Sequence, residues 1–204
     1  MIAQKIKNAM IILKDRMKKR ILRNKLLHTD FSIISNNCWG GAIYQKYGLA
    51  YQSPTVGLYL LGHDFVKFAE RLDYYIACEL EFISWEESSY YEIIKNDKPY
   101  PVARLDDIEI YFMHYSTEKE AAEKWYRRVK RINHEHILFK LSQRERCSKE
   151  DVEKFMYLPL CNKICFAYDE VAGTIYIPEL KNWSGDETPL IEQYYDELTI
   201  LNKL

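Results

Sequence analysis

The 204-residue sequence has no stretch close to the roughly 20 consecutive apolar residues that a membrane-spanning helix needs. Its N-terminus lacks the uncharged apolar segment that a secretory signal requires. The five cysteines do not follow the spacing of a disulfide scaffold. Together these absences predict a chain that works in the reducing cytoplasm.

The sequence also lacks the short motifs of common nucleotide and catalytic sites. It has no phosphate-binding P-loop, no dinucleotide-binding glycine fingerprint and no nucleophile elbow. A net charge of −1 argues against binding to nucleic acid through bulk electrostatics. His134-Glu135-His136 and the pair Cys161 and Cys165 miss the usual spacing of zinc ligands, so we expect no metal site.

The composition is that of an ordinary globular chain. Hydrophobic residues make up 48% and charged residues 29%, which is enough apolar material for a sizeable core. After residue 28, short apolar segments alternate with helical patterns. This alternation predicts one α/β domain over residues 29–204, with a three-layer arrangement in which helices cover both faces of a mostly parallel sheet. The predicted strands are Phe31–Ser35, Thr55–Leu61, Leu80–Ser84, Tyr90–Ile94, Asp107–Tyr115, Ile137–Leu141, Lys163–Tyr168 and Thr174–Ile177.

Helix signals stand between these strands. Gly40–Tyr47 is predicted to be helical and to end at Gly48. Asp64 is the expected N-cap of a second helix. The clearest helix, Glu118–Asn133, begins at Thr117, because Thr117 and Glu120 have the spacing of a capping box.

Residues 1–28 differ from the rest of the chain, since they hold nine basic residues and only one acid, Asp15. Apolar residues recur there at steps of three and four, which predicts a basic amphipathic helix. Three uses are open: docking on the protein's own domain, lying on an anionic membrane surface, or pairing with a partner helix. The apolar positions are Ile2, Ile6, Met10, Leu13, Met17 and Ile21.

A polar, glycine-backed segment follows the first predicted strand. Open α/β sheets place reactive groups where a strand end leads into a helix N-terminus. A thiol there is suited to act as a nucleophile, and the backbone around it to hold an oxyanion or a phosphate. The alternative is a buried structural cysteine in a tight turn. We expect Cys38 to be catalytic and its neighbours to bind substrate, namely Asn36, Asn37, Trp39, Gly40 and Gly41.

Two more side chains complete the expected catalytic set. His114, near the end of the predicted strand Asp107–Tyr115, is the candidate general base. Asp106, next to Asp107 at the start of that strand, is the candidate residue to orient it, and the paired acids could instead bind a cation. A hydrogen-bonded histidine at a strand edge and an ordinary turn are the alternatives.

Arginines on the helix Glu118–Asn133 are candidate substrate ligands. Arg128 and Arg131 lie three residues apart on one helix face, where they could clamp a phosphate or carboxylate. The helix macrodipole alone, which favours cations near a helix C-terminus, is the alternative explanation. Ser53 and Asp64 complete the candidate substrate-binding residues.

Separated segments of the chain, in order, carry a family resemblance. They are Phe31–Gly41, Ser53–Leu58, Tyr100–Asp107, His114-Tyr115 and the pattern Trp125-x2-Arg128-x2-Arg131-Ile132-Asn133. They resemble a bacterial family catalogued as domain of unknown function nineteen-nineteen, whose members are often labelled exopolysaccharide or capsule biosynthesis proteins. The resemblance covers roughly Thr29 to Trp183 and is carried by several motifs in the same order.

A more distant family of capsule proteins binds coenzyme A and is thought to acylate sugars. It carries Asn-Cys-Gln after its first strand, and the comparable segment here is Asn37-Cys38-Trp39, with tryptophan in place of glutamine. The resemblance implies a sugar- or polysaccharide-modifying transferase, most simply an acyltransferase using coenzyme A and a sugar or nucleotide sugar. A non-catalytic carbohydrate-binding component and a related hydrolase are the alternatives. The basic N-terminal helix would place such a protein at the inner face of the membrane.

Overall fold

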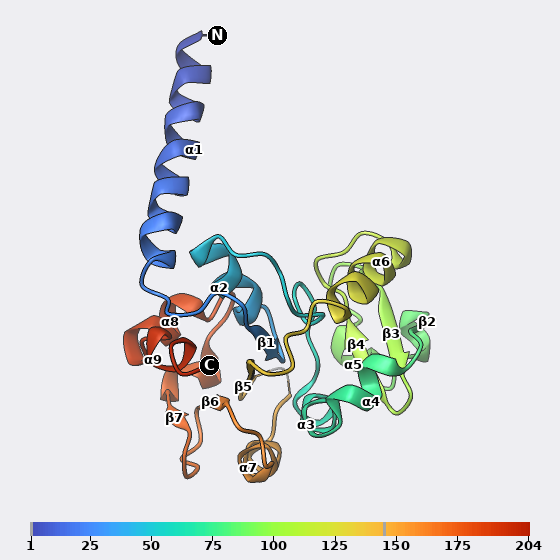
Figure 1. Ribbon diagram of the computed structural model, residues 1–204. Coiled ribbons are helices and arrows are strands. Elements are labelled where there is room, and N and C mark those ends of the chain that lie inside the picture. The colour runs from blue at the N-terminus through green and yellow to red at the C-terminus, as the bar shows by residue number, and fades with distance from the viewer. Residues whose placement is uncertain (1, 145) are drawn as a thin grey trace.

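Two sheets organise the chain, of which the computed structural model describes residues 2–144 and 146–204 (Figure 1). The larger sheet has the strand order β1-β5-β6-β7, and each neighbouring pair runs parallel. The smaller sheet, β2-β3-β4, is antiparallel. The strands are β1 (Ser32–Ser35), β2 (Glu81–Ile83), β3 (Val102–Leu105), β4 (Ile108–Tyr111), β5 (Ile137–Ser142), β6 (Lys163–Ala167) and β7 (Ile175–Tyr176).

Helices occupy most of the remaining chain. The predicted helix start at Thr117 is confirmed, because the Thr117 side chain accepts a hydrogen bond from the Glu120 N–H at 3.1 Å. The α-helices are α1 (Ile2–Arg23), α2 (Trp39–Tyr47), α3 (Gly62–Glu70), α4 (Leu72–Ala77), α5 (Tyr91–Ile94), α6 (Glu118–Val129), α7 (Lys149–Tyr157), α8 (Thr188–Tyr194) and α9 (Leu198–Leu201). Two short 3-10 helices span Trp85–Glu87 and Pro178–Asn182.

Both faces of the parallel sheet are buried, because successive side chains of a strand point to opposite faces. Ile33 of β1 joins a cluster with residues of α2, α8 and α9. Its neighbour Ile34 joins a second cluster with residues of α3, α6 and α7. The four residues of β1 are all buried, although β1 is an edge strand of this sheet.

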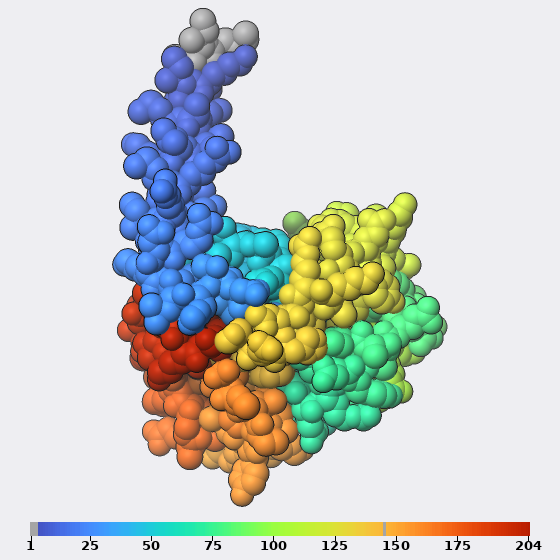
Figure 2. Space-filling model, in the orientation of Figure 1, coloured from blue at the N-terminus to red at the C-terminus, as the bar shows by residue number. Residues whose placement is uncertain are grey.

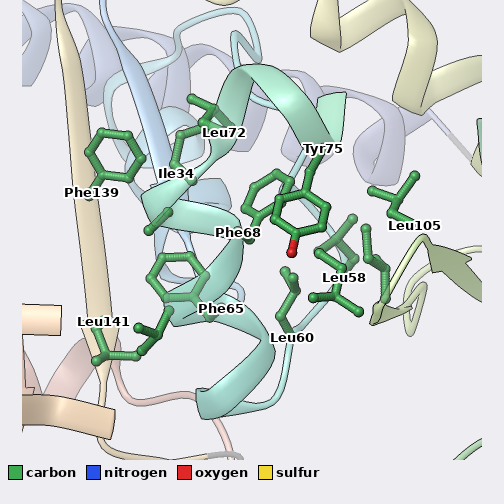
Figure 3. Packing of buried hydrophobic residues seen from close by; sticks show 14 of the residues in the cluster. Ile34, Leu58, Leu60, Phe65, Phe68, Leu72, Tyr75, Leu105, Phe139 and Leu141 are labelled. Carbon is green, nitrogen blue, oxygen red and sulfur yellow. The ribbon is translucent and has the colours of Figure 1, made fainter. Parts of the chain in front are cut away.

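The second cluster also connects the two sheets. Figure 3 shows Phe65 and Phe68 of α3 between Ile34 and Phe139 of the parallel sheet and Leu105 of the antiparallel sheet. All five side chains are at most 8% exposed. The two sheets are therefore held by one continuous apolar core.

Helix α1 projects from this body (Figure 1, Figure 2). The side chains from Gln4 to Lys18 are all exposed, and the first buried side chain after them is Leu26. Docking on the protein's own domain is one of the three uses left open, and the apolar positions from Ile6 to Met17 do not dock in this structure. The side chain of Ile2 lies outside the described part of the structure.

The sequence prediction of one mostly parallel sheet needs correction. The predicted strand Asp107–Tyr115 is shorter, Ile108–Tyr111, and it forms an antiparallel hairpin with β3. Asp106 and Asp107 make the two-residue turn, and Asp106 adopts a left-handed φ of 55°. Aspartate at both turn positions is a weaker hairpin signal than Asn-Gly or Asp-Gly, which is why the sequence pattern does not reveal this sheet.

Two further predicted strands are not strands. Thr55–Leu61 forms turns, with a single antiparallel bridge between Tyr59 and Tyr111. Gly57 has a φ of 81°, a left-handed conformation that interrupts extended backbone. Tyr90–Ile94 contains the short helix α5, because a short apolar run does not distinguish a strand from a helical turn.

Gly62, the first residue of α3, packs directly against the chain before α7. A β-carbon at position 62 would lie 2.4 Å from both the Cα and the Cβ of Cys147. We expect Gly62→Ala to lower the free energy of unfolding by about 3 kcal/mol, measured by urea denaturation, because the backbone itself must move. Gly185→Ala is the control, since nothing lies within 4 Å of its β-carbon and only the cost of its positive φ, about 1 kcal/mol, applies. Equal losses in the two variants would contradict the packing argument.

Candidate functional site

A cavity of about 1080 Å³ opens at the carboxyl ends of β1 and β5. Asn37 and Cys38 follow β1, and Arg144 follows β5, and all three line this cavity. Open sheets with parallel strands commonly bind ligands at this edge. From the antiparallel part of the chain, His114 and Arg128 line the same cavity. Trp39 and Gly41 also line it, so the structure brings half of the predicted site residues to one cavity.

Cys38 is the N-cap residue, directly before α2. It is half-buried, and its Sγ lies 3.7 Å from the Sδ of Met113, the neighbour of His114 in the chain. The Trp39 N–H donates to the Asn37 side-chain oxygen, and the first helical hydrogen bond runs from Ala42 to the Cys38 carbonyl. The backbone N–H groups between them belong to the start of the helix, where anions are favoured.

His114 reaches the cavity from the segment that follows β4. Its backbone N–H donates to the Gly57 carbonyl at 3.1 Å, which fixes the segment beside the Gly57 turn. His114 is exposed and lines the cavity. A thiol and an imidazole therefore share one cavity, which is the pair that a cysteine nucleophile and its base require.

Arg128 is a buried cation at the cavity wall. Arg128 is only 5% exposed. Its Nη1 donates hydrogen bonds to the Val56 carbonyl, at 2.8 Å, and to the Tyr115 hydroxyl. The guanidinium also lies 4.9 Å from the ring centre of Tyr51. Both hydrogen-bond acceptors are neutral, and no carboxylate among residues 2–144 and 146–204 forms an ion pair with Arg128.

Burying the Arg128 charge without a counter-charge is costly, because moving an ion out of water costs roughly several kcal/mol. Lys124, one helical turn earlier, lines the same cavity and lies 5.1 Å from the ring centre of Tyr115. Burial raises the pKa of Tyr115 and the nearby Arg128 charge works against that shift, so the hydroxyl is protonated at neutral pH. This part of the cavity is suited to an anionic group of a ligand.

A buried ion pair adjoins the cavity through Glu187, which lines it, and neither member of the pair was predicted from the sequence. Lys140 is 0% exposed and Glu187 is 3% exposed, and the two form a salt bridge. Lys140 Nζ also donates to the Asn37 side-chain oxygen at 2.9 Å, and the Ser142 hydroxyl donates to Glu187 at 2.7 Å. Lysine inside the apolar strand β5 is the one sequence signal that could have indicated this network.

The network holds Glu187 in its charged form. Burial raises the pKa of its carboxyl, but the Lys140 ammonium and the hydrogen bonds outweigh burial, so the net shift of this pKa is downward. The second Glu187 oxygen lies 3.5 Å from Arg144 Nη1. The network therefore fixes Asn37, and with it the start of α2 beside Cys38.

Three of the residues predicted to bind substrate are buried in the scaffold and do not line the cavity. The Asn36 amide exchanges two hydrogen bonds with the Ser142 backbone, which joins the ends of β1 and β5. Ser53 is 0% exposed and its hydroxyl lies 2.9 Å from that of Thr55. Gly40 allows α2 to approach β1, because a β-carbon there would lie 3.0 Å from Ile33.

Three other predicted residues lie elsewhere. Asp64 is inside α3, whose N-cap is Leu61, and its carboxylate accepts from the Glu109 N–H at 3.1 Å. Burial raises the pKa of Asp64 to about 6. The Asp106 carboxylate accepts a hydrogen bond from the Tyr74 hydroxyl. Asp106 and His114 lie at opposite ends of β4, so Asp106 does not orient that imidazole. Arg131 follows α6 and is exposed away from the cavity.

Comparisons with known proteins give one family model and one similar protein. The family model described as "Domain of unknown function (DUF1919)" matches residues 9–197. An "Uncharacterized protein" of Haemophilus influenzae (strain ATCC 51907 / DSM 11121 / KW20 / Rd) is 31% identical over 209 residues, which is 95% of this chain and 93% of the relative. Neither description names a polysaccharide, coenzyme A or an activity. The chain belongs to the DUF1919 family.

Proposed function

We propose that this protein is a transferase that modifies a sugar or polysaccharide, with an acyl group as the transferred unit. The observation that carries the proposal is Arg128, a buried cation without a carboxylate partner in the described chain, in the same cavity as Cys38 and His114. A phosphate of coenzyme A or of a nucleotide sugar supplies the missing negative charge and accepts two hydrogen bonds from a guanidinium. Tyr51 and Tyr115 beside Arg128 offer aromatic surface for a sugar or a base.

The proposed chemistry has two half-reactions. In the first, the Cys38 sulfur attacks the carbonyl carbon of an acyl thioester, its proton passes to His114, and the donor thiol leaves with that proton. In the second, a sugar hydroxyl attacks the acyl–Cys38 thioester, while His114 takes the hydroxyl proton and returns it to the Cys38 sulfur. The N–H group of Gly41, which lines the cavity at the start of α2, stabilises the oxyanion in both steps.

A carbohydrate-binding component without catalysis is the second candidate function. The feature that favours it is that the cation and aromatic groups around Arg128 form a binding surface without any contribution from Cys38. This candidate predicts the same ligands as the transferase and no turnover with any donor. The two candidates therefore differ in the response to changes at Cys38.

The ligand assignment is tested by replacing Arg128. We expect Arg128→Met to weaken binding of acyl-coenzyme A or of a nucleotide sugar by about 10- to 100-fold, because a hydrogen bond to a charged group contributes about 1.5–3 kcal/mol. Thermal shift and calorimetric titration measure this loss, and ligand at a hundred times its dissociation constant should stabilise the wild type by about 2.7 kcal/mol. The fold should persist, since the Tyr115 hydroxyl still donates to the Val56 carbonyl at 2.5 Å.

Arg131→Met is the matched control. It removes the same charge from the same end of α6, but the side chain lies outside the cavity, so affinity should not change. Binding that both variants weaken equally would indicate attraction by bulk charge and would contradict the assigned site. Absence of binding to every acyl-coenzyme A and nucleotide sugar in the wild type would rule out the proposed ligands.

A further inference from the structure

Helix α1 carries exposed apolar side chains that no part of the described structure covers. Figure 2 shows the helix rising clear of the body. At 22 residues and about 1.5 Å per residue, α1 is about 33 Å long. Its large apolar side chains are between 53% and 62% exposed, although side chains of this kind are normally buried. They are Ile6, Met10, Ile11, Ile12, Leu13, Met17 and Ile21.

Most of these side chains share one face of the helix. At about 100° per residue, Ile6, Met10, Leu13, Met17 and Ile21 fall within a sector of roughly 80°. Cations border this apolar face on both sides. The helix holds one acid, Asp15, which pairs with Lys19 at 2.7 Å. Its basic residues are Lys5, Lys7, Lys14, Arg16, Lys18, Lys19, Arg20 and Arg23.

We propose that α1 is an interfacial helix that binds an anionic lipid surface, with this face in the boundary between headgroups and acyl chains. An apolar stripe flanked by Lys and Arg is the pattern of helices that lie in the plane of a membrane. Each cation near an anionic leaflet contributes to the attraction, which salt screens. The proposal concerns a surface separate from the cavity and does not depend on the proposed function.

The charge of α1 favours an anionic lipid surface over a second copy of the chain as its partner. Two copies of α1 packed face to face would bring two sets of eight cations together, with Asp15 as the only acid of each helix. The same cations exclude a spanning role, and no helix in the described residues is long and apolar enough to cross a membrane. An anionic surface is the partner that satisfies both the apolar face and its charged borders.

The test uses the full chain and sedimentation with vesicles of phosphatidylcholine mixed equally with phosphatidylglycerol. We expect binding to these vesicles, weak binding to pure phosphatidylcholine, and loss of binding at about 1 M salt, where the Debye length is about 3 Å. Leu13→Glu should weaken binding at least about tenfold, because it places a carboxylate in the apolar face.

Ile12→Glu is the matched control, because Ile12 is equally accessible, at 53% against 59% for Leu13, but lies outside the apolar sector. It adds the same charge, so a loss smaller than about twofold supports the assigned face. Equal losses in both variants, or binding to neutral vesicles that salt does not weaken, would overturn it. Dimers that Leu13→Glu dissociates, together with no vesicle binding, would assign the face to a second copy of the chain.

Discussion

Replacement of Lys140 by methionine is expected to lower the free energy of unfolding by about 3–5 kcal/mol, because it leaves a buried carboxylate without its main counter-charge. Glu187 is 3% exposed, so water cannot replace the lost partner without rearrangement. Ser142 still donates one hydrogen bond, and Arg144 lies at 3.5 Å from the second oxygen, but neither replaces the ammonium in direct contact. Chemical denaturation of the two proteins at neutral pH measures the loss.

The pH dependence of this loss has a definite sign. In the wild type the pKa of Glu187 is lowered, so the pair stabilises the fold above the ordinary glutamate pKa and loses that contribution as the pH falls through the lowered value. In Lys140→Met, burial dominates and raises the pKa of Glu187, so the variant is penalised most at high pH. The difference in stability between the two proteins should therefore shrink as the pH falls.

A double variant separates charge from packing. Lys140→Met with Glu187→Leu removes both ions, and we expect it to recover most of the stability lost in the single variant, since apolar groups often replace buried ion pairs without loss. A double variant no more stable than Lys140→Met would show that the hydrogen bonds to Asn37 and Ser142, and not the charge, carry the effect.

Replacement of Cys38 by alanine is expected to lower the proposed acyl transfer at least about a thousandfold, because in the proposed mechanism the sulfur forms the covalent intermediate. Binding of the donor should change little, since Arg128 and the aromatic side chains around it are intact. The measurements are steady-state transfer from an acyl-coenzyme A to a sugar, calorimetric binding of the donor, and intact-mass detection of the acyl–Cys38 adduct.

Cys161→Ala is the control for this experiment. Cys161 is exposed and does not line the cavity, so transfer should be unchanged. Transfer that persists in Cys38→Ala would remove Cys38 from the reaction, while donor binding without turnover in the wild type would favour the carbohydrate-binding component. Cys165 is unsuitable as a control because it is 1% exposed, and burial raises its pKa to about 12, so its removal would disturb the core.

The sequence allowed the cavity to be anticipated where local rules apply. Cys38, Asn37 and Trp39 follow a buried strand and begin a helix, and that order alone predicts the end of a parallel strand. Arg128 and Arg131 look equivalent in sequence, yet only Arg128 is buried, because α6 ends at Val129 and the chain turns away after it. The direction of a side chain near a helix end depends on tertiary packing, and the spacing of residues in the sequence does not predict that packing.

Long-range pairings account for the rest. Lys140 and Glu187 are 47 positions apart, and nothing near Glu187 marks it as the partner of a buried lysine. The antiparallel sheet depends on the hairpin at Asp106. The alternation of apolar and polar residues in the strand after it fits a parallel or an antiparallel sheet equally well. In both cases the interactions that determine the structure join residues far apart in the sequence, and no local sequence pattern predicts such pairs.

The apolar cluster between the two sheets also sets the relative positions of the side chains around the cavity. Cys38 follows β1 of the parallel sheet, whereas His114 and Arg128 lie on the side of the antiparallel sheet. The spacing between these side chains therefore depends on the packing of Phe65 and Phe68 between the two sheets. Preorganisation of this kind lowers the entropy cost of reaching the transition state, and displacements of about 1 Å far from the reacting atoms can cost about a hundredfold in rate. Under the proposed transferase function, the alignment of Cys38 with His114 is thus a property of the hydrophobic core.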